Sequence, residues 1–220
     1  LTIQPSSVQG RYYVGGAIGA NVVNLNSDIT VNGLTVNNSL GTITAEAYCG
    51  GLIGYQRTYT AANLGGKRFQ EALSDGTLLP GIHEGNVPGT AAASLNNNTI
   101  TITAKDNSSL KTASNNMTIR AYAYAGGIVG YCESQTKMYV KDCLNAGGFE
   151  RPTLTSSLSN GVNMETYLSV QGYAEAAAAL HTELAGSTMC VSIIGGVVGV
   201  NGENHVIDHC GNTGTMNGLD

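Results

Sequence analysis

The stretch Gly50-Gly51-Leu52-Ile53-Gly54 decides the fold, because its pattern of two glycines, two apolar residues and a third glycine recurs along the chain. The same pattern, which we call the glycine anchor, stands at 15–19, 126–130 and 195–199. Repetition at long intervals is typical of stacked architectures, in which each unit buries its apolar face against its neighbours. The sequence therefore predicts a stack of equivalent units, one at each anchor.

A strand is predicted before each anchor. Alternate residues of a strand share one face, and the positions one, three, five and seven before each glycine pair are mostly small or apolar. These positions are Val8, Gly10, Tyr12 and Val14; Ile43, Ala45, Ala47 and Cys49; Ile119, Ala121, Ala123 and Ala125; and Thr188, Cys190, Ser192 and Ile194. We expect them to face inward and to form one narrow, tightly packed interior.

The opposite face of these strands differs between anchors. At the second and third anchors it carries Thr44, Glu46 and Tyr48, then Arg120, Tyr122 and Tyr124, which we expect to face solvent. At the fourth anchor it carries Met189, Val191 and Ile193, whose exposure to water is unfavourable. The segment 173–184, rich in Ala and closed by Gly186, predicts a short helix that covers this face.

Composition and spacing fit one all-β domain over residues 1–220. Only 11% of the residues are charged and 30 are Gly, which favours short strands joined by many turns. The segments 65–89 and 151–187 break the pattern, and we predict them to be insertions, with a short helix at 67–74. The anchors are 35, 76 and 69 residues apart, so degenerate units would fit between the clear ones.

Several functions are disfavoured by composition. The net charge is −5 and no cluster of Lys or Arg occurs, so we expect no nucleic-acid partner. No apolar run approaches the roughly 20 residues that span a bilayer, so we expect no membrane span in this segment. Because the chain begins at Leu1 without a Met or a signal peptide, we expect it to be part of a longer protein.

The five cysteines include no Cys-x-x-Cys pair and are odd in number, which disfavours a zinc site and a complete set of disulfides. We expect them to act as small buried hydrophobes. Cys132 and Cys143 flank one loop and are the pair to test for a bridge.

Two units carry a second motif after the anchor. In the last unit, Gly195-Gly196-Val197-Val198-Gly199-Val200-Asn201 is followed by Val206-Ile207-Asp208-His209-Cys210-Gly211-Asn212-Thr213-Gly214, and the third unit continues with Val140-Lys141-Asp142-Cys143-Leu144-Asn145-Ala146-Gly147. This combination resembles the GLUG repeat of bacterial surface proteins. His209 stands where that repeat has an Asn before the Cys, and the first two units match only the opening.

The resemblance implies a right-handed parallel β-solenoid, or β-helix, in a secreted or cell-surface bacterial protein. GLUG repeats are associated with adhesins and with non-catalytic parts of IgA-cleaving metallopeptidases. In that picture Cys143 and Cys210 point inward in equivalent rungs. Asn145 and Asn212 sit at turns, where their side-chain amides satisfy the backbone in a structural role.

Catalytic motifs are missing. His83-Glu84 begins a zincin motif, but Val87 stands in place of the second His, and neither a Gly-x-Ser-x-Gly elbow nor a phosphate-binding loop occurs. His205 and His209 would lie about 13 Å apart on a strand, too far to share an ion. We therefore predict no catalytic residue, no metal and no cofactor, and we expect that the chain is not an enzyme.

The tyrosines are the candidate ligand-binding residues. Tyr48 and Tyr124 occupy one position relative to their anchors, and Tyr55 and Tyr131 occupy another, so stacked units would align them into ladders. Such ladders stabilise neighbouring strands through aromatic pairs. Alternatively, they form an amphipathic platform for sugar rings.

Together these observations predict an all-β parallel solenoid with short helical insertions. Its predicted function is a non-catalytic extracellular repeat module for adhesion or ligand display, with a host or surface glycan or a protein as ligand. The alternative is a carbohydrate-active enzyme, a polysaccharide lyase or glycosidase, on the same scaffold, although the acidic residues are scattered. A third interpretation, ice binding by Thr-x-Thr arrays such as 99–103, is weakened by their irregular spacing.

Overall fold

The structure is a computed structural model that describes residues 1–10, 13–24, 28–45, 48–59, 99–104, 107–121, 124–132, 137–150, 193–201 and 205–216. Within these ranges every regular element is a β-strand, and the strands pair in parallel. The predicted all-β parallel solenoid is therefore confirmed. The helices predicted at 67–74 and 173–184 lie outside the described residues.

The strands form the five faces of the solenoid, and we call each face a sheet, lettered A to E. Sheet E contains β5 (Ile29–Asn32), β10 (Thr99–Thr103), β14 (Lys137–Lys141) and β19 (His205–Asp208). Sheet A contains β1 (Thr2–Ile3), β6 (Thr35–Val36), β15 (Leu144–Asn145) and β20 (Gly211–Asn212), which are connected through bridges at Asn115. Sheet B contains β2 (Ser7–Gly10), β7 (Thr42–Ala45), β11 (Thr118–Ala121) and β16 (Phe149–Glu150). Sheet C contains β3 (Tyr13–Gly15), β8 (Tyr48–Gly50), β12 (Tyr124–Gly126) and β17 (Ile193–Gly195). Sheet D contains β4 (Ile18–Asn24), β9 (Ile53–Tyr59), β13 (Val129–Cys132) and β18 (Val198–Val200).

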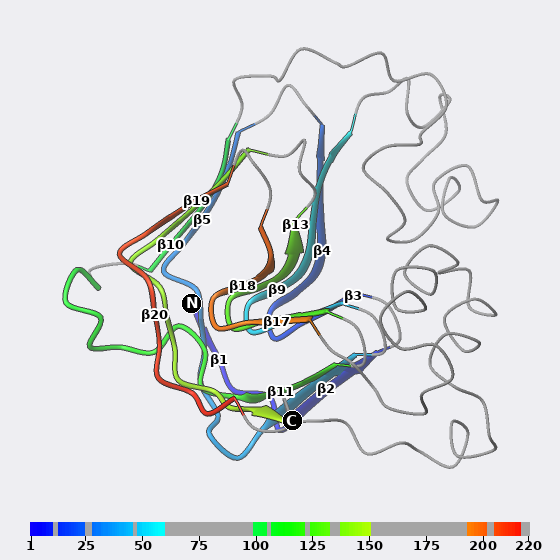
Figure 1. Cartoon of the computed structure of the whole chain (residues 1–220), viewed down its shortest axis with the longest axis vertical. Helices are drawn as coiled ribbons and strands as arrows, with labels where there is room; N and C mark the ends of the chain where they lie inside the picture. Colours follow the sequence, from blue (N-terminus) through cyan, green and yellow to red (C-terminus); the bar gives the residue numbers. More distant parts are fainter. Residues whose placement is uncertain are drawn as a thin grey trace, which may run out of the picture. The chain divides into compact units, whose positions relative to one another are not determined.

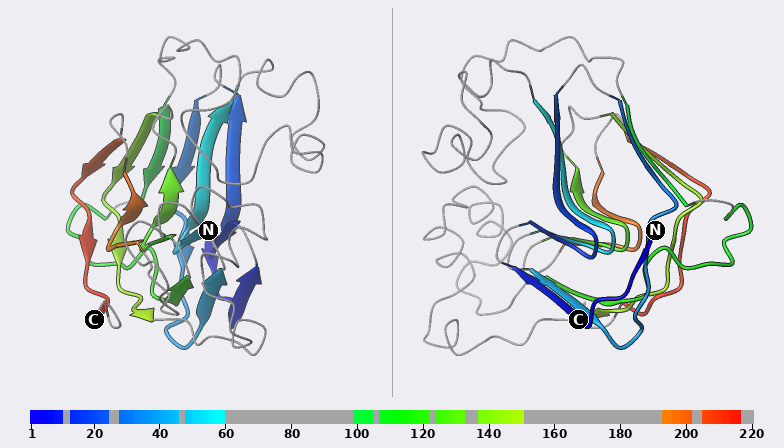
Figure 2. Two further views of the ribbon diagram at one scale, coloured as in Figure 1. Left: turned by 45° about the vertical axis from the view of Figure 1, so that its right-hand side comes forward. Right: turned by 180° about the vertical axis from the view of Figure 1, so that it is seen from behind.

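The chain visits the sheets in the order E, A, B, C, D and then repeats, and we call one such circuit a coil. In Figure 1 the strands of each sheet lie over one another, and in the left view of Figure 2 they lie side by side. Equivalent residues pair between coils, so that Gly50 is opposite Gly15 on one side and Gly126 on the other, and Gly126 is opposite Gly195. Successive anchors are therefore direct neighbours in the stack.

This register corrects one expectation. In the stack of described strands, no degenerate unit separates the anchors at Gly50, Gly126 and Gly195, because their strands pair directly. The long spacings contain 60–98 and 151–192 instead, which are outside the described part of the chain. The solenoid belongs to one compact unit, which consists of Leu1–Thr58, Asn96–Pro152 and Ser192–Asp220. The second unit consists of Tyr59–Leu95 and Thr153–Val191 and includes most of both predicted insertions. Of this second unit, the structure describes only Tyr59.

The predicted inward positions form the interior. Ile43, Ala45 and Cys49 have no exposed surface, and their partners Ile119, Ala121 and Ala125 are also buried. Val14 belongs to the same core, against which Val8 and Ile194 pack; Gly10 lies in the end coil and is exposed. The predicted inward residues Tyr12, Ala47, Ala123, Thr188, Cys190 and Ser192 lie outside the described ranges.

The glycine anchors form the sharp bend between sheets C and D. A Cβ built on Gly126 overlaps the Val129 carbonyl oxygen and lies 2.6 Å from the Gly199 nitrogen of the next coil. A Cβ built on Gly127 overlaps the Gly196 carbonyl oxygen and lies 2.6 Å from the Asn145 Cβ. The anchor therefore needs glycine, because its own coil and the backbone of the next coil leave no room for a Cβ.

Beside the anchors, the buried Asn115 and Asn145 and the half-buried Asn212 form a ladder, which we call the asparagine ladder. The Asn115 Nδ2 donates to the Asn145 Oδ1 at 2.7 Å, and the Asn145 Nδ2 donates to the Asn212 Oδ1 at 2.7 Å. Each amide also donates to a carbonyl two residues ahead in its own coil, at Met117, Gly147 and Gly214. The expected bonds from the Asn145 and Asn212 amides to the backbone are present, although both residues belong to strands, β15 and β20, rather than to turns.

The corner between sheets E and A has a left-handed backbone in three coils. Asp142 has a φ of 55° and His209 a φ of 47°, and Gly33 reaches 67° at the corresponding place in an earlier coil. Asn, Asp and Gly adopt this conformation more readily than other residues. The residues before Cys143 and Cys210 therefore occupy positions that favour residues tolerant of a left-handed backbone.

At the fourth anchor, the expected cover over the outer face is not seen for Ile193. This side chain is 48% exposed, so the expectation that it is covered is wrong, while Met189 and Val191 are not described.

In the described ranges, no helix has the length and apolar character required to cross a membrane.

Candidate functional site

The two predicted tyrosine ladders are present, and their rings contact each other. On sheet C, Tyr48 stacks between Tyr13 and Tyr124, with ring centroids 5.5 and 5.3 Å apart. On sheet D, Tyr55 stacks on Tyr131 at 5.8 Å. We call these five residues the tyrosine cluster.

Contacts between the two ladders connect the outer faces of sheets C and D. Tyr48 is 5.6 Å from Tyr55 and 5.1 Å from Tyr131, and the Tyr124 ring is 5.4 Å from the Tyr131 ring. The Tyr13 ring approaches Tyr55 to 4.4 Å. Tyr48 therefore touches four aromatic rings and is the centre of the cluster.

Burial divides the cluster into two kinds of residue. Tyr48 is 0% exposed and Tyr55 is 1% exposed, whereas Tyr13, Tyr124 and Tyr131 are half-buried. Burial also raises the pKa of Tyr124, because the phenolate would lose its hydration. The expectation that Tyr48 faces solvent is wrong. Sheets C and D meet at an angle at the glycine anchors (Figure 1), and the Tyr48 ring contacts the rings of Tyr55 and Tyr131 from sheet D.

This arrangement has a direct consequence for stability. Replacing Tyr48 with alanine is expected to lower the free energy of unfolding by about 3 kcal/mol, because it removes a fully buried ring and its aromatic partners. Tyr139→Ala is the matched control, with an expected cost of about 1 kcal/mol for a half-buried ring. Urea denaturation of both variants measures the difference, and equal costs would contradict a central role for Tyr48.

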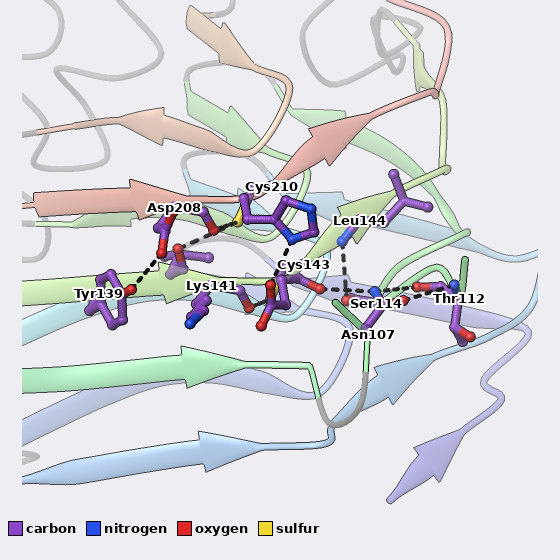
Figure 3. A network of polar contacts seen from close by, with 12 residues as sticks. Asn107, Thr112, Ser114, Tyr139, Lys141, Cys143, Leu144, Asp208 and Cys210 are labelled. Atoms are coloured by element: carbon purple, nitrogen blue, oxygen red, sulfur yellow. Dashed lines mark hydrogen bonds and ion pairs between the residues drawn. The ribbon is translucent and has the colours of Figure 1, made fainter. Parts of the chain in front are cut away.

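A second group of polar side chains lies at the corner between sheets E and A (Figure 3). The Tyr139 hydroxyl donates to the Asp208 Oδ2 at 2.7 Å, which raises the pKa of the phenol. The His209 Nδ1 is 2.7 Å from the Asp142 Oδ1. Asn107, which is buried, donates through Nδ2 to the carbonyls of Thr112 and Asp142 at 2.9 Å and so fixes the loop before sheet A.

All carboxylates in the described ranges connect neighbouring coils. Asp142 and Asp208 do so through His209 and Tyr139. Glu150 pairs with Arg120 through the guanidinium Nε at 2.9 Å, and the Asp28 Oδ1 accepts the Thr99 backbone N–H at 2.9 Å. Each of these four described acids has a structural partner in a neighbouring coil.

The described cysteines are free thiols. Cys49, Cys132 and Cys143 are buried and Cys210 is half-buried, and no disulfide joins Cys132 to Cys143. Cys143 and Cys210 do occupy equivalent positions in neighbouring coils, because Leu144 is the register partner of Gly211. Among the described residues, no group of His, Cys, Asp and Glu is arranged to hold a metal ion, and His205 is buried while His209 is exposed.

The repeat pattern predicted the ladders of the tyrosine cluster but did not point to Asn115 or Asn107. Asn115 lies four residues before the inward-facing Ile119, as Asn145 lies four residues before Phe149, its partner in sheet B. That spacing was a usable signal for the third member of the asparagine ladder. Asn107 belongs to a loop that occurs in one coil only, so no repeat position pointed to it.

Ligand binding at Tyr48, Tyr55, Tyr124 and Tyr131 stays a prediction, and the half-buried Tyr124 and Tyr131 are the members with surface to offer. No protein-family model matches the chain, and neither does any curated protein or solved structure.

Proposed function

We propose that this chain is a non-catalytic repeat module of a bacterial cell-surface protein, similar to GLUG-repeat adhesins, which displays or binds an extracellular ligand. The observation that carries the proposal is the use of polar groups between coils. The described carboxylates and the asparagine ladder all connect one coil to the next. Such side chains build a rigid scaffold, whereas a catalytic acid needs to be available to a substrate.

The ligand class that we propose is a glycan, bound at the edge of the tyrosine cluster. Tyr124 and Tyr131 are half-buried and present aromatic surface with a hydroxyl at its rim. Their register partners in the next coil are Ile193 and Val200, so the ladders continue as aliphatic side chains. The apolar faces of sugar rings stack on surfaces of this kind.

The test is a glycan array probed with the purified chain and with the double variant Tyr124→Ala/Tyr131→Ala. We expect a loss of at least about tenfold in apparent affinity, which corresponds to removal of about 1.4 kcal/mol of contact energy. Tyr139→Ala, a tyrosine of sheet E outside the cluster, is expected to bind like the parent.

Two results would count against the proposal. Unchanged binding by the double variant would remove the cluster from the binding site. Bond cleavage in a bound oligosaccharide would favour the carbohydrate-active enzyme. Circular dichroism of each variant separates lost binding from lost folding.

A further inference from the structure

Cys143 and Cys210 are placed to be joined. They stand immediately before the register partners Leu144 and Gly211, at the same corner of two consecutive coils. The Gly211 N–H donates to the Cys143 carbonyl at 3.0 Å, which holds the two backbones in contact. Neighbouring strands lie about 4.8 Å apart, and disulfides span Cα distances of about 4.4–6.8 Å.

The two thiols also point the same way. The Cys143 Sγ lies 3.3 Å from the Lys141 carbonyl oxygen, and the Cys210 Sγ lies 3.3 Å from the equivalent carbonyl of Asp208. The Cys210 Sγ is in addition 3.4 Å from the Val140 carbonyl of the preceding coil, so it leans toward the coil that contains Cys143.

The proximity of Cys143 favours the thiolate form of Cys210. The neighbouring Cys143 thiol lowers the pKa of Cys210 to about 7. Burial and the carboxylates of Asp142 and Asp208 act in the opposite direction, and Tyr139 also faces this thiol. The same contact together with burial raises the pKa of Cys143. Cys210, which is half-buried, is thus the thiol that reacts first.

We propose that Cys143 and Cys210 form a redox-controlled disulfide that covalently joins two consecutive coils of the solenoid. The oxidant is a low-molecular-weight disulfide such as oxidised glutathione. The Cys210 thiolate attacks one sulfur of that disulfide, its S–S bond breaks, and one glutathione leaves as the thiolate.

The second step completes the exchange. Cys143 loses its proton and attacks the Cys210 sulfur, the mixed disulfide breaks, and the second glutathione leaves. Two protein thiols are oxidised by two electrons, and one oxidised glutathione is reduced to two glutathione molecules. The proposal is independent of the ligand that the module binds.

The other described cysteines serve as internal controls. The Cys49 thiol is fully buried and donates to the Ile43 carbonyl at 3.5 Å, and its burial raises its pKa. Cys132 is buried on sheet D. Both are therefore expected to stay reduced while the protein is folded.

The experiment treats the purified chain with oxidised glutathione at pH 7 and maps disulfides by mass spectrometry after digestion without reduction. We expect one cross-link, between the peptides that contain Cys143 and Cys210, loss of two free thiols, and a higher melting temperature than in the reduced protein. Cys143→Ser is expected to stop at a glutathione adduct on Cys210, and Cys210→Ser to form neither product. Cys49→Ser and Cys132→Ser should cross-link like the parent.

Three results would contradict the proposed disulfide between Cys143 and Cys210. Retention of both thiols in the folded parent, a cross-link to Cys49, Cys132 or Cys190, or a parent that stays at the mixed disulfide would each overturn the proposal. The melting temperature of the untreated serine variants shows that they are folded, so a missing cross-link cannot be assigned to unfolding.

Discussion

Replacing Gly126 with alanine is expected to unfold the protein. The new methyl group would overlap the Val129 carbonyl oxygen and would lie 2.6 Å from the Gly199 nitrogen. Both neighbours are backbone atoms of paired strands, which cannot move without breaking the C–D bend in two coils. We expect a cost above about 5 kcal/mol, which is comparable to the whole stability of a typical domain.

Gly211→Ala is the matched control for this prediction. A Cβ at Gly211 meets only the side-chain carbons of Leu144 and Leu110, at 3.3 and 3.4 Å, and these can shift. Its expected effect is within about 1 kcal/mol in either direction. Circular dichroism and urea denaturation measure both variants. If Gly126→Ala melts within a few degrees of the parent, close backbone approach is not the reason for the anchor.

The anchors also show how far the sequence alone could go. Strand alternation before each glycine pair placed Ile43, Ala45 and Ile119 in the interior, because side-chain direction in a strand is set by position alone. The same rule could not say what covers the opposite face of sheet C. That depends on the angle at which sheet D leaves the anchor, and this angle is fixed by backbone contacts between residues far apart in the sequence.

Tyr48 shows what the strand pattern could not predict. Its position and its ladder partners were predictable from the repeat, but its complete burial was not. Burial arises because Tyr55 and Tyr131 approach from sheet D at the bend. The anchor spacings suggested extra units for a related reason. A distance along the chain includes any inserted segment as well as the coil itself. The spacing therefore cannot distinguish one coil with an insertion from two short coils.

Replacing Asn145 with aspartate tests the asparagine ladder with almost no change in shape. The two N–H groups of the Asn145 amide donate to the Asn212 Oδ1 and to the Gly147 carbonyl oxygen, and its oxygen accepts from Asn115. A carboxylate keeps the last contact but directs its second oxygen at two acceptors. Because the site is fully buried, we expect a loss of about 4 kcal/mol at pH 7.

The loss of stability in Asn145→Asp should increase as pH rises, which a general packing defect would not produce. Burial and the two facing oxygens raise the pKa of the introduced carboxyl above the value of about 3.9 that it has in the unfolded chain. The folded state then binds more protons than the unfolded state, so stability relative to the parent falls as pH rises through the folded pKa and recovers toward pH 4.

Recovery should be incomplete, because a protonated carboxyl has one O–H where the amide has two N–H groups, and one acceptor remains without a donor. Asn37→Asp, on the exposed side where Asn37 accepts from the Asn116 Nδ2 at 2.5 Å, should show no such pH dependence. Urea denaturation of the parent and both variants between pH 4 and 8 measures the difference. A constant loss for Asn145→Asp across this range would mean that the ladder contributes through packing rather than through its alternating donors and acceptors.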